Sequence, residues 1–118
     1  MYEIFWQAPG WPAFPAGYQS KIEQWVRDVA ADDGKTSNPF AAITQYFDGS
    51  GPGNYNVHFG GSALVHAAPD SPQCSHGSIC VSIQSIIDEI DAYRLSLGLP
   101  TGVGSNQFGI ILPPGVTT

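Results

Sequence analysis

The fold is decided by the stretch Ile43–His66, ITQYFDGSGPGNYNVHFGGSALVH. Glycine-rich turns divide it into two or three short strands, and a segment with helical spacing lies on each side. It holds two of the chain's three histidines and four of its aromatic residues. We therefore expect this stretch to form the centre of a sheet, as a wall that presents Tyr46, Asp48 and His58.

The two flanking segments are predicted to be helices over Tyr18–Asp33 and Val81–Leu97. Apolar residues recur in both at three- and four-residue spacing, which is typical of a helix with one buried face. Ser82 is a natural N-cap for the second helix, since its hydroxyl can accept a bond from an early backbone N–H. Gly34 and Gly98 follow the two segments and are expected to end them.

Strands are predicted at both ends of the chain and between the helices. Aromatic, β-branched or alternating residues indicate them in Tyr2–Trp6, Phe40–Phe47, Asn54–Phe59, Ser62–His66 and Gln107–Leu112. The near-continuous apolar run of the last one predicts an interior strand, covered on both faces. Gly60-Gly61 predicts a bulge or a close backbone approach.

These elements predict an α/β (α+β) fold over residues 1–118, a single compact domain with a mixed sheet and two helices in β-α-β-β-α-β order. A ferredoxin-like split βαβ is one way to wind that order. A larger mixed sheet, completed by segments beyond this chain, is the other.

Composition excludes two classes of partner. Net charge is −6, charged residues make up 12 %, and four cations are spread along the 118 residues. Nucleic acid and anionic membranes attract clustered Lys and Arg, so we expect neither as a partner. No apolar run reaches the ~20 residues of a membrane span. Strand-like residues begin directly after Met1, so we expect any export signal to have been removed.

Cys74 and Cys80 lie six residues apart in a loop rich in proline and serine. They can close a small disulfide ring, or they can be free thiols of a cytosolic protein. The low charge and the loop context favour the disulfide and a secreted, extracellular protein.

The aromatic and histidine residues give only partial sites. Trp11, in the loop Gln7–Gly17, is either a ligand platform or an anchor of that loop on the core, and we favour the anchor. His58 and His66 lack a third ligand for zinc, and Asp48 begins a calcium-loop fragment without its final acid. We therefore predict no metal and no cofactor. The candidate binding residues are Trp11, Tyr46, Asp48, Tyr55, His58 and His66.

Catalysis by this chain alone is not expected. Nucleophilic catalysis needs a nucleophile, a base and an orienting group, and no G-x-S-x-G elbow is present. A weaker alternative is a small hydrolase that uses Asp48, His58 and His66.

Five blocks carry a family resemblance: YEIFWQAPGW, YQSKIEQWVRDVAADDGKTSNPFAAITQYFDGSG, NYNVHFGGSALV, CSHGSICVSIQSIIDEI and NQFGIILPPGV. In order and spacing they resemble the N-terminal half of secreted bacterial proteins related to the plant phosphate-induced (EXORDIUM-like) family. The resemblance implies a metallopeptidase-like C-terminal half with a Cys-rich stretch and a His-Glu helix motif. No His-Glu pair occurs in this sequence, so no catalytic residue carries over. The resemblance also implies a Cys74–Cys80 disulfide, an extracellular setting and a strand Gln107–Leu112 that leads towards the other half.

Two functions follow as hypotheses. The first is a non-catalytic N-terminal domain of a longer secreted metallopeptidase-like protein, with a scaffolding or substrate-groove role and the C-terminal domain as its partner. The second is a stand-alone extracellular module for carbohydrate or protein recognition, or for self-association through unpaired sheet edges. Its sugar-stacking candidates are Trp6, Trp11, Tyr18, Tyr46 and Tyr55.

Overall fold

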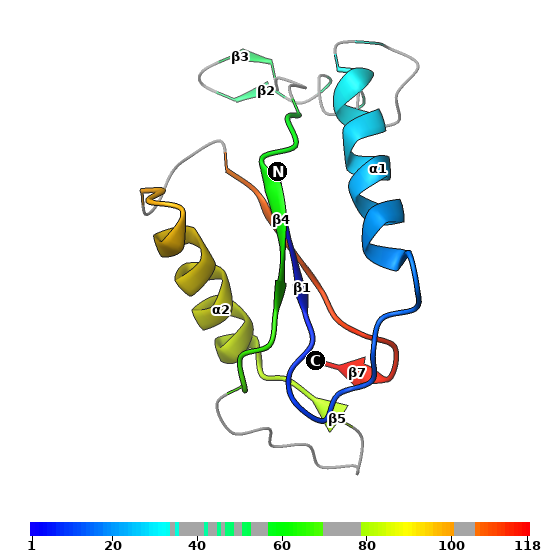
Figure 1. Cartoon of the computed structure of the whole chain (residues 1–118). Helices are drawn as coiled ribbons and strands as arrows, with labels where there is room; N and C mark the ends of the chain where they lie inside the picture. The colour runs from blue at the N-terminus through cyan, green and yellow to red at the C-terminus, as the bar shows by residue number, and fades with distance from the viewer. Residues whose placement is uncertain are drawn as a thin grey trace.

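The computed structural model describes residues 1–33, 35, 42, 45, 47–48, 51–52, 57–69, 79–100 and 106–118. It is an α/β domain, as predicted (Figure 1). The described elements are β1 (Tyr2–Trp6), α1 (Tyr18–Ala31), β2 (Phe47–Asp48), β3 (Gly51–Pro52), β4 (Gly61–Val65), β5 (Ile79–Cys80), α2 (Ile83–Ser96), β6 (Phe108–Ile111) and β7 (Val116–Thr117). This succession does not reproduce the predicted β-α-β-β-α-β order.

The centre of the main sheet is β1, which lies between β4 and β6. Ile4, Phe5 and Trp6 are almost fully buried, because β1 has a neighbour on each side and a helix over each face. The prediction that Ile43–His66 forms the centre is therefore wrong: β4, its described strand, lies at one edge. The prediction of an interior strand at Gln107–Leu112 is also wrong, since β6 lies at the other edge of the described sheet.

Both neighbours run parallel to β1. Tyr2 is paired with Gly61 of β4 and with Phe108 of β6, and the register continues along the strands. In a split βαβ another strand would separate β1 from β4, so the ferredoxin-like alternative is not observed. Among the described strands, antiparallel pairing occurs between β2 and β3, while β5 and β7 pair in parallel.

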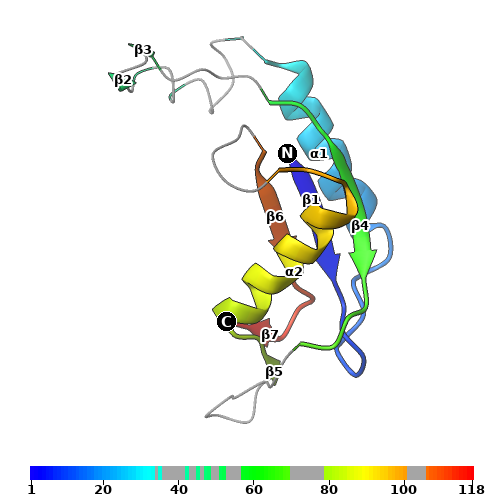
Figure 2. The ribbon, with the colours of Figure 1, turned by 90° about the vertical axis from the view of Figure 1, so that its left-hand side faces the viewer.

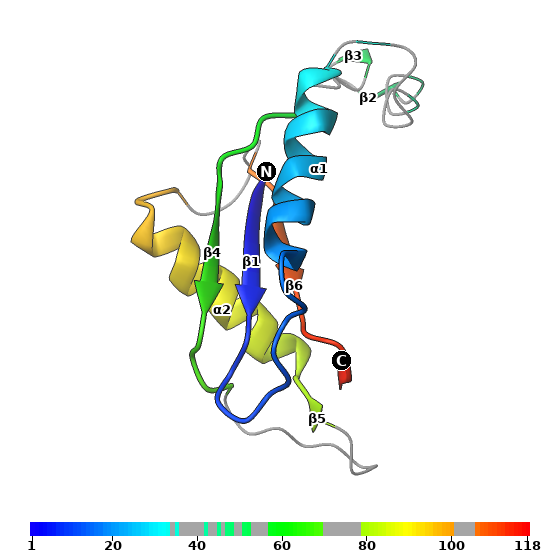
Figure 3. The same cartoon turned by 45° about the vertical axis from the view of Figure 1, so that its right-hand side comes forward.

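The two helices cover opposite faces of this sheet. Figures 1 and 3 show α1 on one side of the strands and α2 on the other. Side chains alternate between the faces along a strand. On the α1 side, Phe5 meets Phe14 edge to face at 5.7 Å between ring centroids. On the α2 side, Phe108 stacks on Tyr2 at 5.3 Å and meets Tyr93 at 6.4 Å.

The helix boundaries follow local signals. Ser82 caps α2 as predicted, and its Oγ accepts a bond from the Ser85 N–H at 3.0 Å. Gly98, at φ 66°, ends α2, because this left-handed conformation has little cost for glycine. The Arg94 guanidinium donates to the Leu99 carbonyl at 2.7 Å and completes this helix end. The first helix stops at Ala31, two residues before its predicted end; Gly34 lies outside the described residues.

The chain before β4 differs from its prediction. Residues 57–60 are not a strand, and β4 begins at Gly61; residues 54–56 and most of Phe40–Phe47 lie outside the described part. At Gly60 the close approach comes from a side chain and not from the backbone as predicted, since a Cβ on Gly60 would overlap the Tyr2 ring. Gly61 has φ 142°, a backbone conformation that favours glycine.

Candidate functional site

Trp11 lies against the core, as the anchor interpretation predicts. Its ring is half-buried beside Trp6, with 5.4 Å between centroids and a tilt of 47°. Phe14 anchors the same loop on Phe5 and stacks on Tyr18. Trp6, which was one of the sugar-stacking candidates, is 1 % exposed and therefore cannot present its ring to a ligand.

The other predicted binding residues are dispersed or lie outside the described residues. His58 precedes β4 and His66 follows it, so roughly five strand residues at ~3.3 Å each separate them. The α-ammonium of Met1 donates to the His58 carbonyl at 2.6 Å, while His66 Nδ1 lies 2.8 Å from the Gln7 carbonyl oxygen. Asp48 lies in β2, for which only the backbone is described, and Tyr46 and Tyr55 lie outside the described residues. The described part of the chain contains no group of three potential metal ligands.

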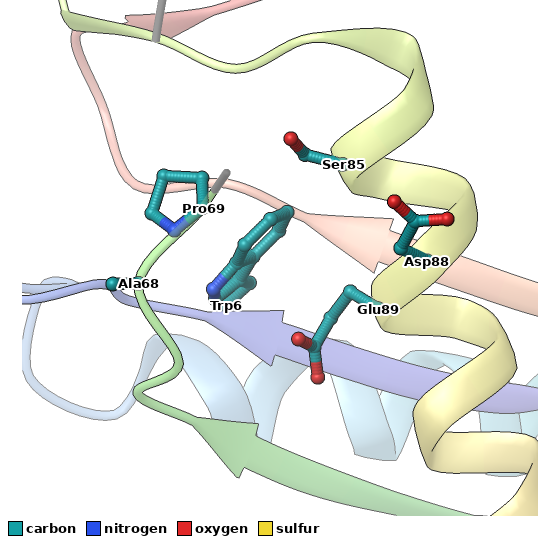
Figure 4. Close-up of a pocket in the computed structure, with 6 residues that line it drawn as sticks. All are labelled: Trp6, Ala68, Pro69, Ser85, Asp88 and Glu89. Atoms are coloured by element: carbon teal, nitrogen blue, oxygen red, sulfur yellow. The ribbon is translucent and has the colours of Figure 1, made fainter. Parts of the chain in front are cut away.

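A cavity of about 110 Å³ opens at the carboxyl end of β1 and β4. It is lined by Trp6, Ala68, Pro69, Ser85, Asp88 and Glu89 (Figure 4). The Trp6 indole donates to the Ala67 carbonyl at 2.8 Å and so fixes the chain that leaves β4. Burial raises the pKa of Glu89. Ligand pockets usually measure ~300–1,000 Å³, so this cavity suits a few waters better than an organic substrate.

Glu3 is a buried ionisable residue that the sequence analysis does not name as a candidate. It is 5 % exposed in the central strand, and its carboxyl group occupies the space that a side chain at Gly109 would need. Burial raises its pKa, and the nearby Met1 α-ammonium acts in the opposite direction. The sequence feature that could have indicated it is a single acidic residue within the otherwise uncharged strand Tyr2–Trp6. The absence of a side chain at Gly109 leaves room for this carboxyl group.

Among the described residues, no strand pairs with the outer edge of β6. The Tyr2 N–H donates to the Gln107 carbonyl at 2.8 Å, so the backbone of Gln107 faces β1. Alternate residues of a parallel strand point to opposite neighbours. Gly109 and Ile111 therefore also face β1, while the N–H and C=O of Phe108 and Ile110 point away from the described sheet.

Apolar side chains flank this edge on the α2 face. Ser85 and Glu89 turn towards the cavity beside Ala68, which follows β4. At 3.6 residues per turn, Ile83 and Ile87 lie roughly on the opposite flank of α2, towards β6. They are 71 % and 46 % exposed. Figure 2 shows α2 crossing this face, with β6, β1 and β4 side by side behind it.

The β4 edge is different, because polar contacts flank it. The Ser62 hydroxyl donates to a Glu23 carboxyl oxygen, and Gln19 donates to the same oxygen at 3.0 Å. Together they lower the pKa of Glu23. The Arg27 guanidinium lies over the Phe59 ring, 4.1 Å from its centroid. The flank of β4 thus combines these polar contacts with the exposed Leu64, whereas the α2 flank beside β6 presents the exposed Ile83 and Ile87.

Counted along the chain, the parallel strands lie in the order second-first-third (β4-β1-β6), and with a helix on each face this is the arrangement around the switch point of a doubly wound α/β sheet. The chain matches no protein-family model, no curated protein and no solved structure. In the described residues, no helix is long and apolar enough to cross a membrane. Fold and side-chain geometry therefore carry the functional argument.

Proposed function

We propose that this chain is a non-catalytic scaffolding domain of a secreted protein, with the β6 edge as its docking surface. The single observation that carries the proposal is the asymmetry of the sheet. Its β6 edge presents the free backbone of Phe108 and Ile110 beside exposed isoleucines, whereas its β4 edge is bordered by Glu23 and Arg27. Parallel sheets normally have their apolar residues covered on both faces, so an exposed apolar edge suits a partner.

The chemistry of the described residues supports a scaffold over an enzyme. His58 and His66 lie beyond opposite ends of β4, and the cavity beside Trp6 is small. Purified chain is expected to show no turnover of peptide or ester substrates, with or without added zinc. Turnover that survives further purification and scales with protein concentration would contradict the proposal.

In this proposal the chain is the N-terminal part of a longer protein related to the EXORDIUM-like family, with the metallopeptidase-like chemistry in the C-terminal half. What supports it is the resemblance of the five sequence blocks to the N-terminal half of that family. Sequencing the native transcript past the codon of Thr118 tests this. A downstream His-Glu motif is the expected result, and a stop codon there would refute the longer protein.

The disulfide belongs to the same proposal. Cys80 lies in β5, paired with Thr117 of β7, and no cysteine among the described residues is free; Cys74 lies outside them. A Cys74–Cys80 bridge would stabilise the fold by roughly 2 kcal/mol. Non-reducing mass spectrometry of the secreted protein should show resistance to alkylation until a reductant is added. Alkylation of both cysteines without a reductant would show that they are free thiols. That result would refute the disulfide and weaken the extracellular assignment.

A second candidate is a stand-alone self-assembling or binding module. The free β6 edge favours self-assembly, because such edges template pairing with another chain. Sugar recognition now depends on Trp11 and Tyr18 among the described candidates. Glycan-array binding that is lost in Trp11→Ala would support it, and an unchanged array would leave assembly as the better alternative.

A further inference from the structure

We infer that the β6 edge pairs antiparallel with the β6 edge of a second copy of this chain, which joins two three-stranded sheets into one of six strands. The inference rests on the proposed function only for the edge being a docking surface. It adds the identity of the partner, the register of the contact and the symmetry of the pair.

The outward backbone groups of β6 are complementary to those of a second β6 strand that runs antiparallel to it. Phe108 and Ile110 point their N–H and C=O groups outward, and they flank Gly109 symmetrically. In an antiparallel pair centred on Gly109, Phe108 of one copy faces Ile110 of the other, and both residues exchange two hydrogen bonds. The reverse pair does the same by two-fold symmetry, so all outward groups of these two residues are satisfied.

Glycine at the centre suits this register. Gly109 points its own backbone towards β1 and would form the non-hydrogen-bonded pair on the symmetry axis, where Cα atoms come within ~4.5 Å. A larger side chain there would also collide with Glu3 of its own chain. The residue that allows Glu3 to be buried is therefore also the residue that allows two edges to approach closely.

The helix flanks support the same arrangement. A two-fold axis perpendicular to the sheet places α2 of both copies on one face. Ile83 and Ile87, on the flank towards β6, would then border the new junction, while Tyr93, which contacts Phe108, lies nearer the axis. Burial of these side chains supplies the hydrophobic contribution that backbone pairing alone lacks.

Charge favours a second copy at this edge over the opposite one. The chain carries a net charge of −6, so two copies repel unless their contact avoids acidic residues. Phe108–Ile111 contains no charged group, and the charged residues on this flank of α2, Asp91 and Arg94, form an ion pair with each other at 3.1 Å. The β4 edge lies beside Glu23 and Arg27, and it also lacks a glycine at the centre of its outward residues Ser62 and Leu64. The observations therefore point to β6 for self-pairing.

Sedimentation equilibrium from micromolar to submillimolar concentration tests the inference. Wild-type chain should sediment as a reversible dimer. Ile110→Pro removes an outward N–H without removing a bond to β1, and should weaken dimerisation at least about tenfold. Leu64→Pro makes the matched change at the other edge and should leave the dimer intact. Circular dichroism of each variant checks that it is folded.

Ile83→Glu keeps the test decisive if proline at position 110 prevents folding. Ile83 is largely exposed, so the change does not disturb the core, yet it adds an acid to the β6 flank of a chain whose net charge is already −6, and it should also weaken dimerisation. Leu95→Glu is its control, because Leu95 is 65 % exposed and faces away from the junction on the same helix. A wild-type monomer at every concentration, or a dimer that persists in both Ile110→Pro and Ile83→Glu, overturns self-pairing. Either result leaves the scaffolding function intact, because turnover by the chain and the sequence past Thr118 test that function separately.

Discussion

Glu3 is the residue whose chemistry departs most from its surroundings. Burial in β1 raises its pKa, so the folded chain holds this proton more tightly than the unfolded chain does. Its stabilising contribution is fully present below the ordinary glutamate pKa and is lost as pH rises through the raised value.

Glu3→Gln should therefore raise the thermal midpoint at pH 7 by a few degrees, since a neutral side chain of the same size avoids burying a charge. The advantage over wild type should vanish in acid, where Glu3 itself is protonated. Thermal melts of both proteins across the pH range measure this difference. An advantage that persists unchanged at low pH would show that ionisation of Glu3 is not the cause.

Gly60 leaves room for the Tyr2 ring beside the start of β4. Gly60→Ala should lower the free energy of unfolding by about 1–3 kcal/mol through overpacking. Denaturant unfolding of the single variants and of Gly60→Ala with Tyr2→Ala forms a double-mutant cycle. The two costs should be clearly less than additive; strict additivity would mean that the ring is not what excludes a side chain at position 60.

At the scale of elements, α2 depends on its N-cap. Ser82→Ala removes the bond from the Ser85 N–H and should cost about 1 kcal/mol of stability. Ser20→Ala, at an exposed position inside α1, is the control and should be neutral or slightly stabilising, because alanine favours helix. Equal losses in both variants, measured by chemical denaturation, would contradict a specific capping role.

The helices were predictable because their signals are local. Apolar spacing placed both of them, Ser82 marked one start and Gly98 one end. The predicted end of α1 is two residues too late, because Asp32 is the C-cap, with a non-helical φ of −94° and ψ of 14°. Gly60 was flagged by sequence for the same local reason, although its neighbour Tyr2 lies far away in the chain.

At the scale of the whole molecule, strand order was not predictable, because it depends on which distant segments meet. Tyr2–Trp6 and Phe108–Ile111 are both apolar runs, and only the structure shows that the first is central and the second lies at an edge. The same holds for the candidate site. The position of Trp11 on the core is predictable from the sequence, whereas the outer edge of β6 and the burial of Glu3 depend on strand pairing. That β6 has the composition of a covered strand yet lies at an edge is itself the reason to expect a partner there.

Amide hydrogen exchange along β6, measured by NMR at low and high protein concentration, tests the central claim most directly. Gly109 and Ile111 bond to β1, so their amides should be protected at both concentrations, whereas Phe108 and Ile110 should exchange rapidly in dilute protein. At high concentration the amides of Phe108 and Ile110 should become protected, while that of Leu64 at the β4 edge should not change. Exchange of Ile110 that is slow in dilute protein, or equally fast at both concentrations, would contradict an open edge that a second strand fills.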